Sequence, residues 1–399
     1  MFGNGAKLGV SADRQAFIRT RAGKLFPRED AVLAGVVTII IALAGQVVEN
    51  TGYDMPGSQW FWRNARLYLL ICGLIVLAET TIRLLIERPS SPLRYLLSPG
   101  IANLLAHRVF AMVPIMAVAL LMPAFSAVKS SIGRINPFDW DATFITLDQA
   151  IHGTDPWRLL HPVMGHPAVT YLASNLYHIW FLLIYLGPVL FAFYLRDRQL
   201  RLSFFFSYVA TWTVVGMIFA MLFASVGPCF VGPIFGNAHF AEQMVYLQQA
   251  DRIYPLAVLD VQQQLLDWYR VEDAGLGRGI TAMPSMHVAL AWLYVLVTWR
   301  IDRRLGYVFA AFFVAILLSS VHLAYHYAVD GYVAVALVTA IWFLCRRAAT
   351  ALAPPLAKTD NPITARKSKT SEFLNLSAIF TLFRPRRAAS QAGNGTAAK

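Results

Sequence analysis

The stretch LSFFFSYVATWTVVGMIFAMLFASVGPCFVGPIFGNAHFA, residues 202–241, contains no Asp, Glu, Lys or Arg. A membrane-spanning helix needs about 20 predominantly apolar residues, so this run is longer than one span requires. Its second half contains helix-breaking glycines and prolines, in the order Gly227-Pro228-Cys229-Phe230-Val231-Gly232-Pro233. We therefore expect a span over 203–226, followed by a loop that lies on the membrane or dips into it.

The whole chain has the composition of a membrane protein. Of its 399 residues, 57% are hydrophobic and only 14% are charged, and the mean hydropathy is +0.52. Soluble domains carry roughly 25% charged residues. The apolar runs are long and unbroken, whereas the strands of a membrane barrel alternate in segments of about ten residues. The composition excludes a chain that is disordered throughout and predicts an all-α, polytopic membrane protein.

Eight runs are apolar enough and long enough to predict membrane spans. They lie near 31–50, 65–86, 104–128, 168–195, 203–226, 283–299, 305–322 and 327–345. We expect the last six, about 104–345, to form one helical core. Within the second run, Glu79 and Arg83 are four residues apart on one helical face and predict an internal ion pair.

The distribution of positive charge predicts the orientation of the spans. The formal net charge is +12, which alone could suggest nucleic acid as a partner. If the N-terminus is cytoplasmic, however, 25 Lys and Arg fall in cytoplasmic segments and 8 in outer ones. This bias predicts that both termini are cytoplasmic. We attribute the charge to topology and contact with anionic lipid, and we expect no nucleic-acid partner.

This topology divides the chain into three parts. Residues 1–103 contain a basic cytoplasmic N-terminus and two leading helices, and residues 104–347 contain the core with outer segments 129–167 and 227–280. Residues 348–399 form a basic cytoplasmic tail whose composition predicts flexibility. An apolar stripe at helical spacing in the tail is either an interfacial helix or incidental. It consists of Phe373, Leu376, Phe380 and Phe383.

Two stretches concentrate histidine beside signals for the start of a helix. The first, RGITAMPSMH (residues 278–287), opens the sixth span, and the second, SSVHLAYHYAVD (residues 319–330), joins the seventh span to the eighth. Since spans alternate in direction, His287 comes to the same outer level as His326 and Asp330. Histidine is costly inside a membrane and usually has a function there.

The spacing of these residues indicates phosphate chemistry. On a helix, Asp330 can reach a ring nitrogen of His326, four residues earlier, which fixes the tautomer and favours a nucleophile at the other nitrogen. Pro284 and Ser285 are typical of a helix start, and free N–H groups near Ser285 and Met286 would favour phosphate. His322, four residues before His326, either lines the same site or is a hydrogen-bonded core residue.

These motifs resemble a known family. Pro-Ser-Met-His at 284–287 and His-Tyr-Ala-Val-Asp at 326–330 look like the second and third signatures of the type 2 phosphatidic acid phosphatase (PAP2) superfamily. Their forms are most similar to those of the inositol phosphorylceramide synthase branch, and sphingomyelin synthases share the His-Tyr-x-x-Asp ending. The motifs cover about 278–335, and a weaker likeness in span order extends from about 140 to 345. The first signature, Lys-x6-Arg-Pro, is absent, which favours a transferase over a plain phosphatase.

The resemblance implies a two-step phosphotransfer without metal or cofactor. His326 would attack phosphorus, Asp330 would orient the imidazole of His326, and His287 would be the general acid and base. Ser285, Met286 and His322 are expected to contact the substrate. With the first signature absent, the candidates for the phosphate-binding cation are Arg278, then Lys129 and Arg134.

Three functions remain open at this stage. The first is transfer of a phosphorylated head group, of the inositol phosphate type, from a glycerophospholipid to a lipid hydroxyl such as that of ceramide. The second is a lipid phosphate phosphatase, in which water replaces the alcohol. The third is a proton-coupled transporter, but such proteins often have inverted repeats and mid-membrane sites, and no repeat is visible here. Membrane lipids are the expected partners, and the active site is expected to face the periplasm or lumen.

Overall fold

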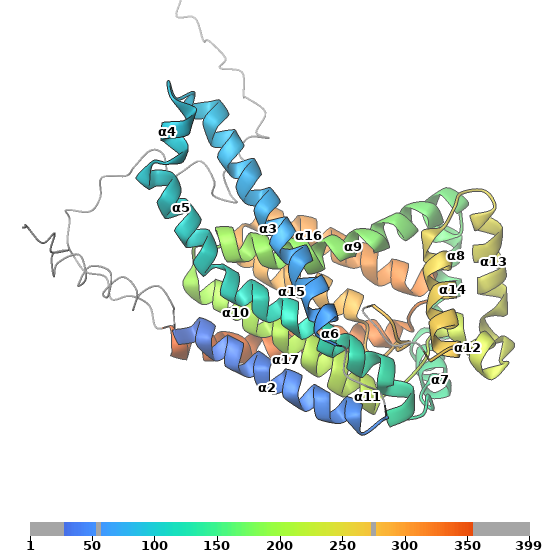
Figure 1. Ribbon diagram of the computed structural model, residues 1–399. Coiled ribbons are helices and arrows are strands. Elements are labelled where there is room, and N and C mark those ends of the chain that lie inside the picture. Colours follow the sequence, from blue (N-terminus) through green and yellow to red (C-terminus); the bar gives the residue numbers. More distant parts are fainter. Residues whose placement is uncertain (1–27, 53–56, 273–276, 354–399) are drawn as a thin grey trace, which may run out of the picture. The chain divides into compact units, whose positions relative to one another are not determined.

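The computed structural model describes residues 28–52, 57–272 and 277–353. These residues form helices joined by turns, with no β-strand among them (Figure 1). The all-α prediction is therefore confirmed. The expected stripe at 373–383 lies outside the described residues.

Seven helices in the described part of the chain are long and apolar enough to cross a membrane. They are α2 (Arg28–Glu49), α3 (Ser58–Glu87), α5 with α6 (Pro99–Phe110 and Met112–Ile135), α9 (Pro167–Tyr194), α10 with its continuation (Arg198–Leu222), α16 (Arg303–His322) and α17 (Ala328–Leu352). The chain is thus an integral, multi-pass membrane protein. The remaining expected span, 283–299, is the shorter helix α15 (Met286–Ile301).

The short helix α15 is buried on all sides. Val288, Ala289, Leu290 and Ala291 are successive residues and each is 0% exposed. A helix that is hydrophobic around its whole circumference belongs in the interior, and α15 packs against α16, α17 and α10. Because α15 is surrounded by other helices, its first turns lie inside the bundle.

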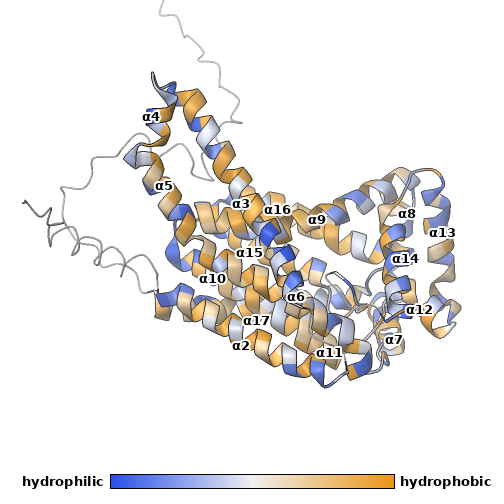
Figure 2. Ribbon diagram, viewed as in Figure 1, coloured by the Kyte–Doolittle hydropathy of each residue, from blue (hydrophilic) through white to orange (hydrophobic). Residues whose placement is uncertain are grey.

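The two segments expected as outer loops are largely helical. The first contains α7 (Asp141–His152) and α8 (Pro156–Met164), and the second contains α12 (Pro228–Phe235), η2 (Ala238–Phe240), α13 (Ala241–Asp251) and α14 (Ala257–Arg270). Hydrophilic residues are more frequent on α8, α13 and α14 than on the long helices (Figure 2). The loop expected directly after residue 226 is wrong in detail, since α12 begins at Pro228.

The third span extends further than its hydropathy indicated. Helix α6 continues to Ile135, whereas the sequence analysis ended the span at 128. It ends at Asn136, whose backbone is extended (φ −142°, ψ 122°), because the following Pro137 disfavours the helical conformation at that position. The extra turns carry Lys129 and Arg134 on a rigid helix instead of a loop.

A buried ion-pair cluster connects the leading helices to the core. Glu79 of α3 is 3% exposed and pairs with Arg83 (3.1 Å) and with Arg108 of α5 (2.9 Å). The guanidinium of Arg108 also donates to the carbonyl oxygen of Phe193 on α9. The predicted Glu79–Arg83 pair is confirmed, and Arg108 extends it into a link between three helices.

Candidate active site

The two histidine-bearing segments meet at the ends of three helices. His287 is the second residue of α15, and His326 lies between the end of α16 and the start of α17. Their ring centroids are 6.2 Å apart. Residues that are 39 positions apart in the sequence thus lie within reach of one small group.

The contact between His326 and Asp330 depends on the cap of a helix. Helix α17 begins at Ala328, so His326 precedes it and the two residues do not share a helix. Asp330 is the third residue of α17, and its Oδ2 accepts from the N–H of Tyr327 (3.0 Å) and lies 3.1 Å from Nδ1 of His326. An acidic residue at this position typically caps the helix start. With the Nδ1 proton donated to the carboxylate, Nε2 of His326 carries the free lone pair.

The start of α15 presents free N–H groups. Ser285 is the N-cap, its Oγ accepts from the N–H of Val288 (3.4 Å), and its own N–H donates to the carbonyl oxygen of Asp330 (3.3 Å). For the N–H groups of Met286 and His287, no acceptor is found among the described residues. A helix start with free N–H groups favours an anion.

Aromatic rings of α9 enclose the imidazole of His287. The ring of Tyr177 stacks on it at a centroid distance of 4.0 Å and an angle of 15°, and the ring of Trp180 at 3.9 Å and 28°. These two contacts fix the plane of the imidazole. The sequence indicated a helix-packing contact for Tyr177 and no role for Trp180, although their spacing of three places them on one face of a helix.

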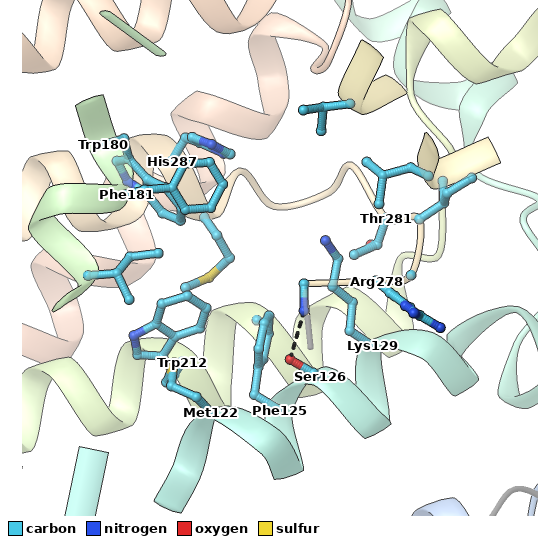
Figure 3. A pocket seen from close by; sticks show the side chains of 18 of the residues that line it. Met122, Phe125, Ser126, Lys129, Trp180, Phe181, Trp212, Arg278, Thr281 and His287 are labelled. Atoms are coloured by element: carbon cyan, nitrogen blue, oxygen red, sulfur yellow. Dashed lines mark hydrogen bonds between the residues drawn. The ribbon is translucent and has the colours of Figure 1, made fainter. Parts of the chain in front are cut away.

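A cavity of about 550 Å³ opens beside the histidines. It is lined by residues of α3, α6, α9, α14, the π-helix Thr211–Phe219 that continues α10, and the segment 277–287, and both His287 and His326 border it. Most of its wall is apolar and aromatic, as in Phe125, Trp180 and Trp212 (Figure 3). Small-molecule sites are typically mostly apolar with a few convergent polar groups.

Two cations reach the polar end of this cavity. Lys129 extends from α6 and Arg278 from the segment before α15 (Figure 3). Arg278 lies over the ring of Trp268, with 4.5 Å from Cζ to the ring centroid. Lys129 has no hydrogen bond or ion pair with any of the described residues. An ammonium group without a protein partner in such a place is available to an anionic ligand.

Three residues expected at the substrate are placed elsewhere. His322 is 1% exposed and does not line the cavity, because its Nε2 bonds to Oγ1 of Thr170 (2.9 Å). Ser285 is fully buried and serves as a helix cap. Arg134 pairs with Glu272 and lines a separate cavity of about 320 Å³. Met286 and Arg278 do line the main cavity.

The residues directly before α12 and at its start hold both histidine-bearing segments. We call residues 225–229 the strap. Its Ser225 accepts from the N–H groups of Ala282 (2.9 Å, by its carbonyl oxygen) and Met283 (3.2 Å, by Oγ), and the N–H of Cys229 donates to the carbonyl oxygen of Ala324 (2.8 Å). The strap therefore joins the segment before His287 to the segment before His326.

Comparison with known families gives one match that contains both histidine-bearing segments. A family model described as the PAP2 superfamily matches residues 142–344, slightly more than half of the chain. Both histidine-bearing segments lie within the match, whereas α3 and α6, which complete the cavity, precede it. No curated protein and no solved structure matches the chain.

We predict that Gly227→Ala disturbs the site through a steric clash and backbone strain. Gly227 has φ +90°, and a Cβ there would lie 2.6 Å from the carbonyl oxygen of Tyr325. Gly236 (φ +69°, ψ 14°) lies in the left-handed helical region with open space around it, so Gly236→Ala has no clash, whereas Gly227 (φ +90°, ψ 161°) lies in a region that is essentially limited to glycine and adds backbone strain. Gly227→Ala should reduce the free energy of unfolding by about 1–3 kcal/mol more than Gly236→Ala. Thermal unfolding in detergent measures the difference, and equal destabilisation by the two variants would contradict the prediction.

Proposed function

The chain belongs to the PAP2 superfamily, and from this we propose that it is a membrane lipid phosphotransferase. Membership supports an enzyme of the lipid phosphatase or phosphotransferase type that acts on membrane lipids. We propose more specifically that it transfers a phosphorylated head group, of the inositol phosphate type, from a glycerophospholipid to a lipid hydroxyl such as that of ceramide. The catalytic domain would be residues 104–347.

One observation carries the proposal. His326, which is hydrogen-bonded to Asp330, and His287 line the same largely apolar cavity as Lys129, whose ammonium group has no partner among the described residues. A nucleophile, an acid and base, and a cation are the groups that phosphoryl transfer requires. Their arrangement around one cavity with apolar walls supports a phosphorylated lipid as substrate.

In the first step, Nε2 of His326 attacks the phosphorus of the donor lipid. A nitrogen–phosphorus bond forms, and the bond between phosphorus and the glycerol oxygen breaks. His287 gives a proton to the departing oxygen, so that diacylglycerol leaves as an alcohol. Asp330, which accepts a hydrogen bond from Nδ1 of His326, stabilises the positive charge that develops on the ring.

In the second step, His287 removes a proton from the hydroxyl of the acceptor. The oxygen attacks phosphorus, the nitrogen–phosphorus bond breaks, and His326 returns to its initial state. The free N–H groups of Met286 and His287, together with Lys129 and Arg278, would stabilise the negative charge on the phosphoryl oxygens in both steps. Fixed dipoles and cations in a site that excludes water are well suited to this task.

The wall of the cavity supports a lipid substrate. Leu67 of α3 and Phe181 of α9 line it, and these two residues are 38% and 45% exposed. In a membrane such side chains face acyl chains. A lipid with its phosphate beside Lys129 could therefore keep its chains between α3 and α9 and in contact with the bilayer.

A second observation favours water as an alternative acceptor. The separate cavity of about 320 Å³ is lined by polar side chains such as Arg270 and Glu272, and it shares Lys129 and Gly279 with the main cavity. A polar cavity beside the phosphate-binding cation would admit water. The alternative function is thus a lipid phosphate phosphatase.

Assay of the purified protein separates these functions. Labelled phosphatidylinositol should yield diacylglycerol and a phosphorylated sphingolipid only when ceramide is present. Release of inositol phosphate without ceramide would mean a hydrolase.

Replacement of His326 tests the proposed nucleophile. His326→Gln should lower kcat by about 10³-fold or more, because it removes the nucleophile, whereas the exposed His107→Gln should not. Activity retained by His326→Gln would refute the mechanism.

Replacement of Lys129 should separate activity from stability. Because Lys129 has no partner among the described residues, Lys129→Met should leave the unfolding temperature unchanged or raise it. The loss of a cation at the phosphoryl oxygens should lower kcat/KM by about 10²–10³-fold. Lys129→Arg should restore part of this loss, and the exposed outer residue Arg252 gives a control, Arg252→Met. An unaltered kcat/KM in Lys129→Met would mean that cations other than Lys129 bind the phosphate.

The proposed orientation can be tested by labelling. The charge bias supports cytoplasmic termini and an active site that faces the periplasm or lumen. Cysteine introduced at the exposed Gln264 of α14 should react with an impermeant maleimide added outside sealed cells. Cysteine at Arg304, at the other end of the bundle, should react only after permeabilisation. The reverse pattern would overturn the orientation, and the wild-type protein gives the background from its own cysteines.

A further inference from the structure

Two aspartates of α7 hold the backbone on which the candidate nucleophile depends. Asp141 and Asp148 are seven residues apart, which is about two helical turns, so they project from one face of α7. Their side chains are buried, with 5% and 3% of each residue exposed. A buried carboxylate is costly unless it is hydrogen-bonded, and both have several donors.

Asp148 binds the start of the helix that carries Asp330. Its Oδ2 accepts from the N–H of Ala328 (2.8 Å) and its Oδ1 from the N–H of Val329 (2.9 Å). These are the first two residues of α17, and Asp330 is the next. A carboxylate with both oxygens on a helix start fixes the position and direction of that helix. Asp148 therefore determines where the Asp330 side chain meets His326.

Asp141 binds the strap and the residue after His326 together. Its Oδ2 accepts from the N–H of Val226 (2.9 Å), and its Oδ1 accepts from the N–H of Gly227 (2.9 Å) and the hydroxyl of Tyr327 (2.7 Å). The strap in turn holds the segment before His287 through Ser225. One carboxylate thus connects the segments of both histidines.

Asp148 also affects where phosphate can bind. Its carboxylate occupies the first N–H groups of α17, whereas those of Met286 and His287 at the start of α15 have no acceptor among the described residues. Of these two helix starts, only the one at α15 presents free N–H groups toward an anion. The same carboxylate would repel a phosphate near α17.

We propose that Asp141 and Asp148 are positioning residues that set the placement of His326 relative to His287 and direct the phosphoryl group to the start of α15. This inference rests on the proposed function, but the geometry that carries it is independent of the identity of the lipid. Neither residue lines the cavity of about 550 Å³, so both act through the backbone that they bind, and Asp141 also through the Tyr327 hydroxyl.

The electrostatic surroundings agree with this role. Burial raises the pKa of Asp148, and the N–H groups of Ala328 and Val329 oppose that shift. Burial also raises the pKa of Tyr327, and the charge of Asp141 adds to the effect. The Tyr327 hydroxyl therefore stays protonated and donates to Asp141.

Variants of Asp148 test the inference by activity. Asp148→Asn keeps one acceptor oxygen, and Asp148→Ala keeps none. We expect kcat to fall by about 10-fold in the first and about 100-fold in the second, with KM within about twofold, because a small displacement of a reacting group is enough for such losses. Asp155→Asn is the matched control, since Asp155 is equally buried but pairs with His239 and Gln149. It should keep kcat.

A second measurement does not require turnover. Diethyl pyrocarbonate modifies histidine rings, and mass spectrometry of the peptide that contains His326 gives its rate of modification relative to that of His107. The rate for His326 should change severalfold in Asp148→Ala and stay constant in Asp155→Asn. If no lipid is converted by the wild type, the proposed function fails, while this measurement still decides the inference.

Two results would overturn the inference. One is a fall in kcat that is no larger than the loss of folded protein measured by thermal unfolding, or a fall of the same size in Asp155→Asn. Either outcome would mean a general effect on stability. The other is an unchanged rate of His326 modification in Asp148→Ala.

Discussion

Asp330 connects the two histidine-bearing segments by bonds from both its side chain and its backbone. The carboxylate binds Nδ1 of His326 and the N–H of Tyr327, and the carbonyl oxygen accepts from the N–H of Ser285. The first two bonds determine how the candidate nucleophile is held, and the third ties the cap of α15 to the start of α17. Asp330 is 0% exposed, so these bonds form away from competing water, where they are electrostatically strong.

The surrounding helices keep this connection in place and still leave a cavity beside it. The segment Thr211–Phe219 is a π-helix that continues α10. Such segments are rare and frequently occur at functional sites, and here the segment brings Trp212 and Gly216 to the cavity wall. A Cβ at Gly216 would lie 2.8 Å from the ring of Phe125 and 3.1 Å from the sulfur of Met286. The π-helix is therefore packed closely against Phe125 and Met286 in the wall of the cavity.

Sequence reasoning succeeded where a property is local. Long apolar runs predicted the membrane helices, and the spacing of His326 and Asp330 predicted their contact, because four residues bridge both a helical turn and a capped helix start. For His322 the same spacing left two alternatives open, and the structure shows the hydrogen-bonded core residue. It is also four residues from His326, but Ala324 between them adopts φ +60° and the chain reverses, so His322 turns toward Thr170. The stacking of Tyr177 and Trp180 on His287 depends on how α9 packs against α15, which no local pattern encodes.

The candidates for the phosphate-binding cation also depend on how separate elements of the chain pack together. The Lys-x6-Arg-Pro signature is absent from the chain, so an enzyme of this family needs a positive charge from another element. Lys129 and Arg278 border the cavity from two different directions, and Lys129 precedes the region that matches the family. Helix α6 can supply this charge because it extends to Ile135 instead of ending at the apolar limit of the span. Gly279 permits the segment before α15 to approach α6, since a Cβ at this position would lie 2.7 Å from the carbonyl oxygen of Lys129. The close contact between α6 and the segment before α15 thus makes a helix outside the family region part of the candidate site.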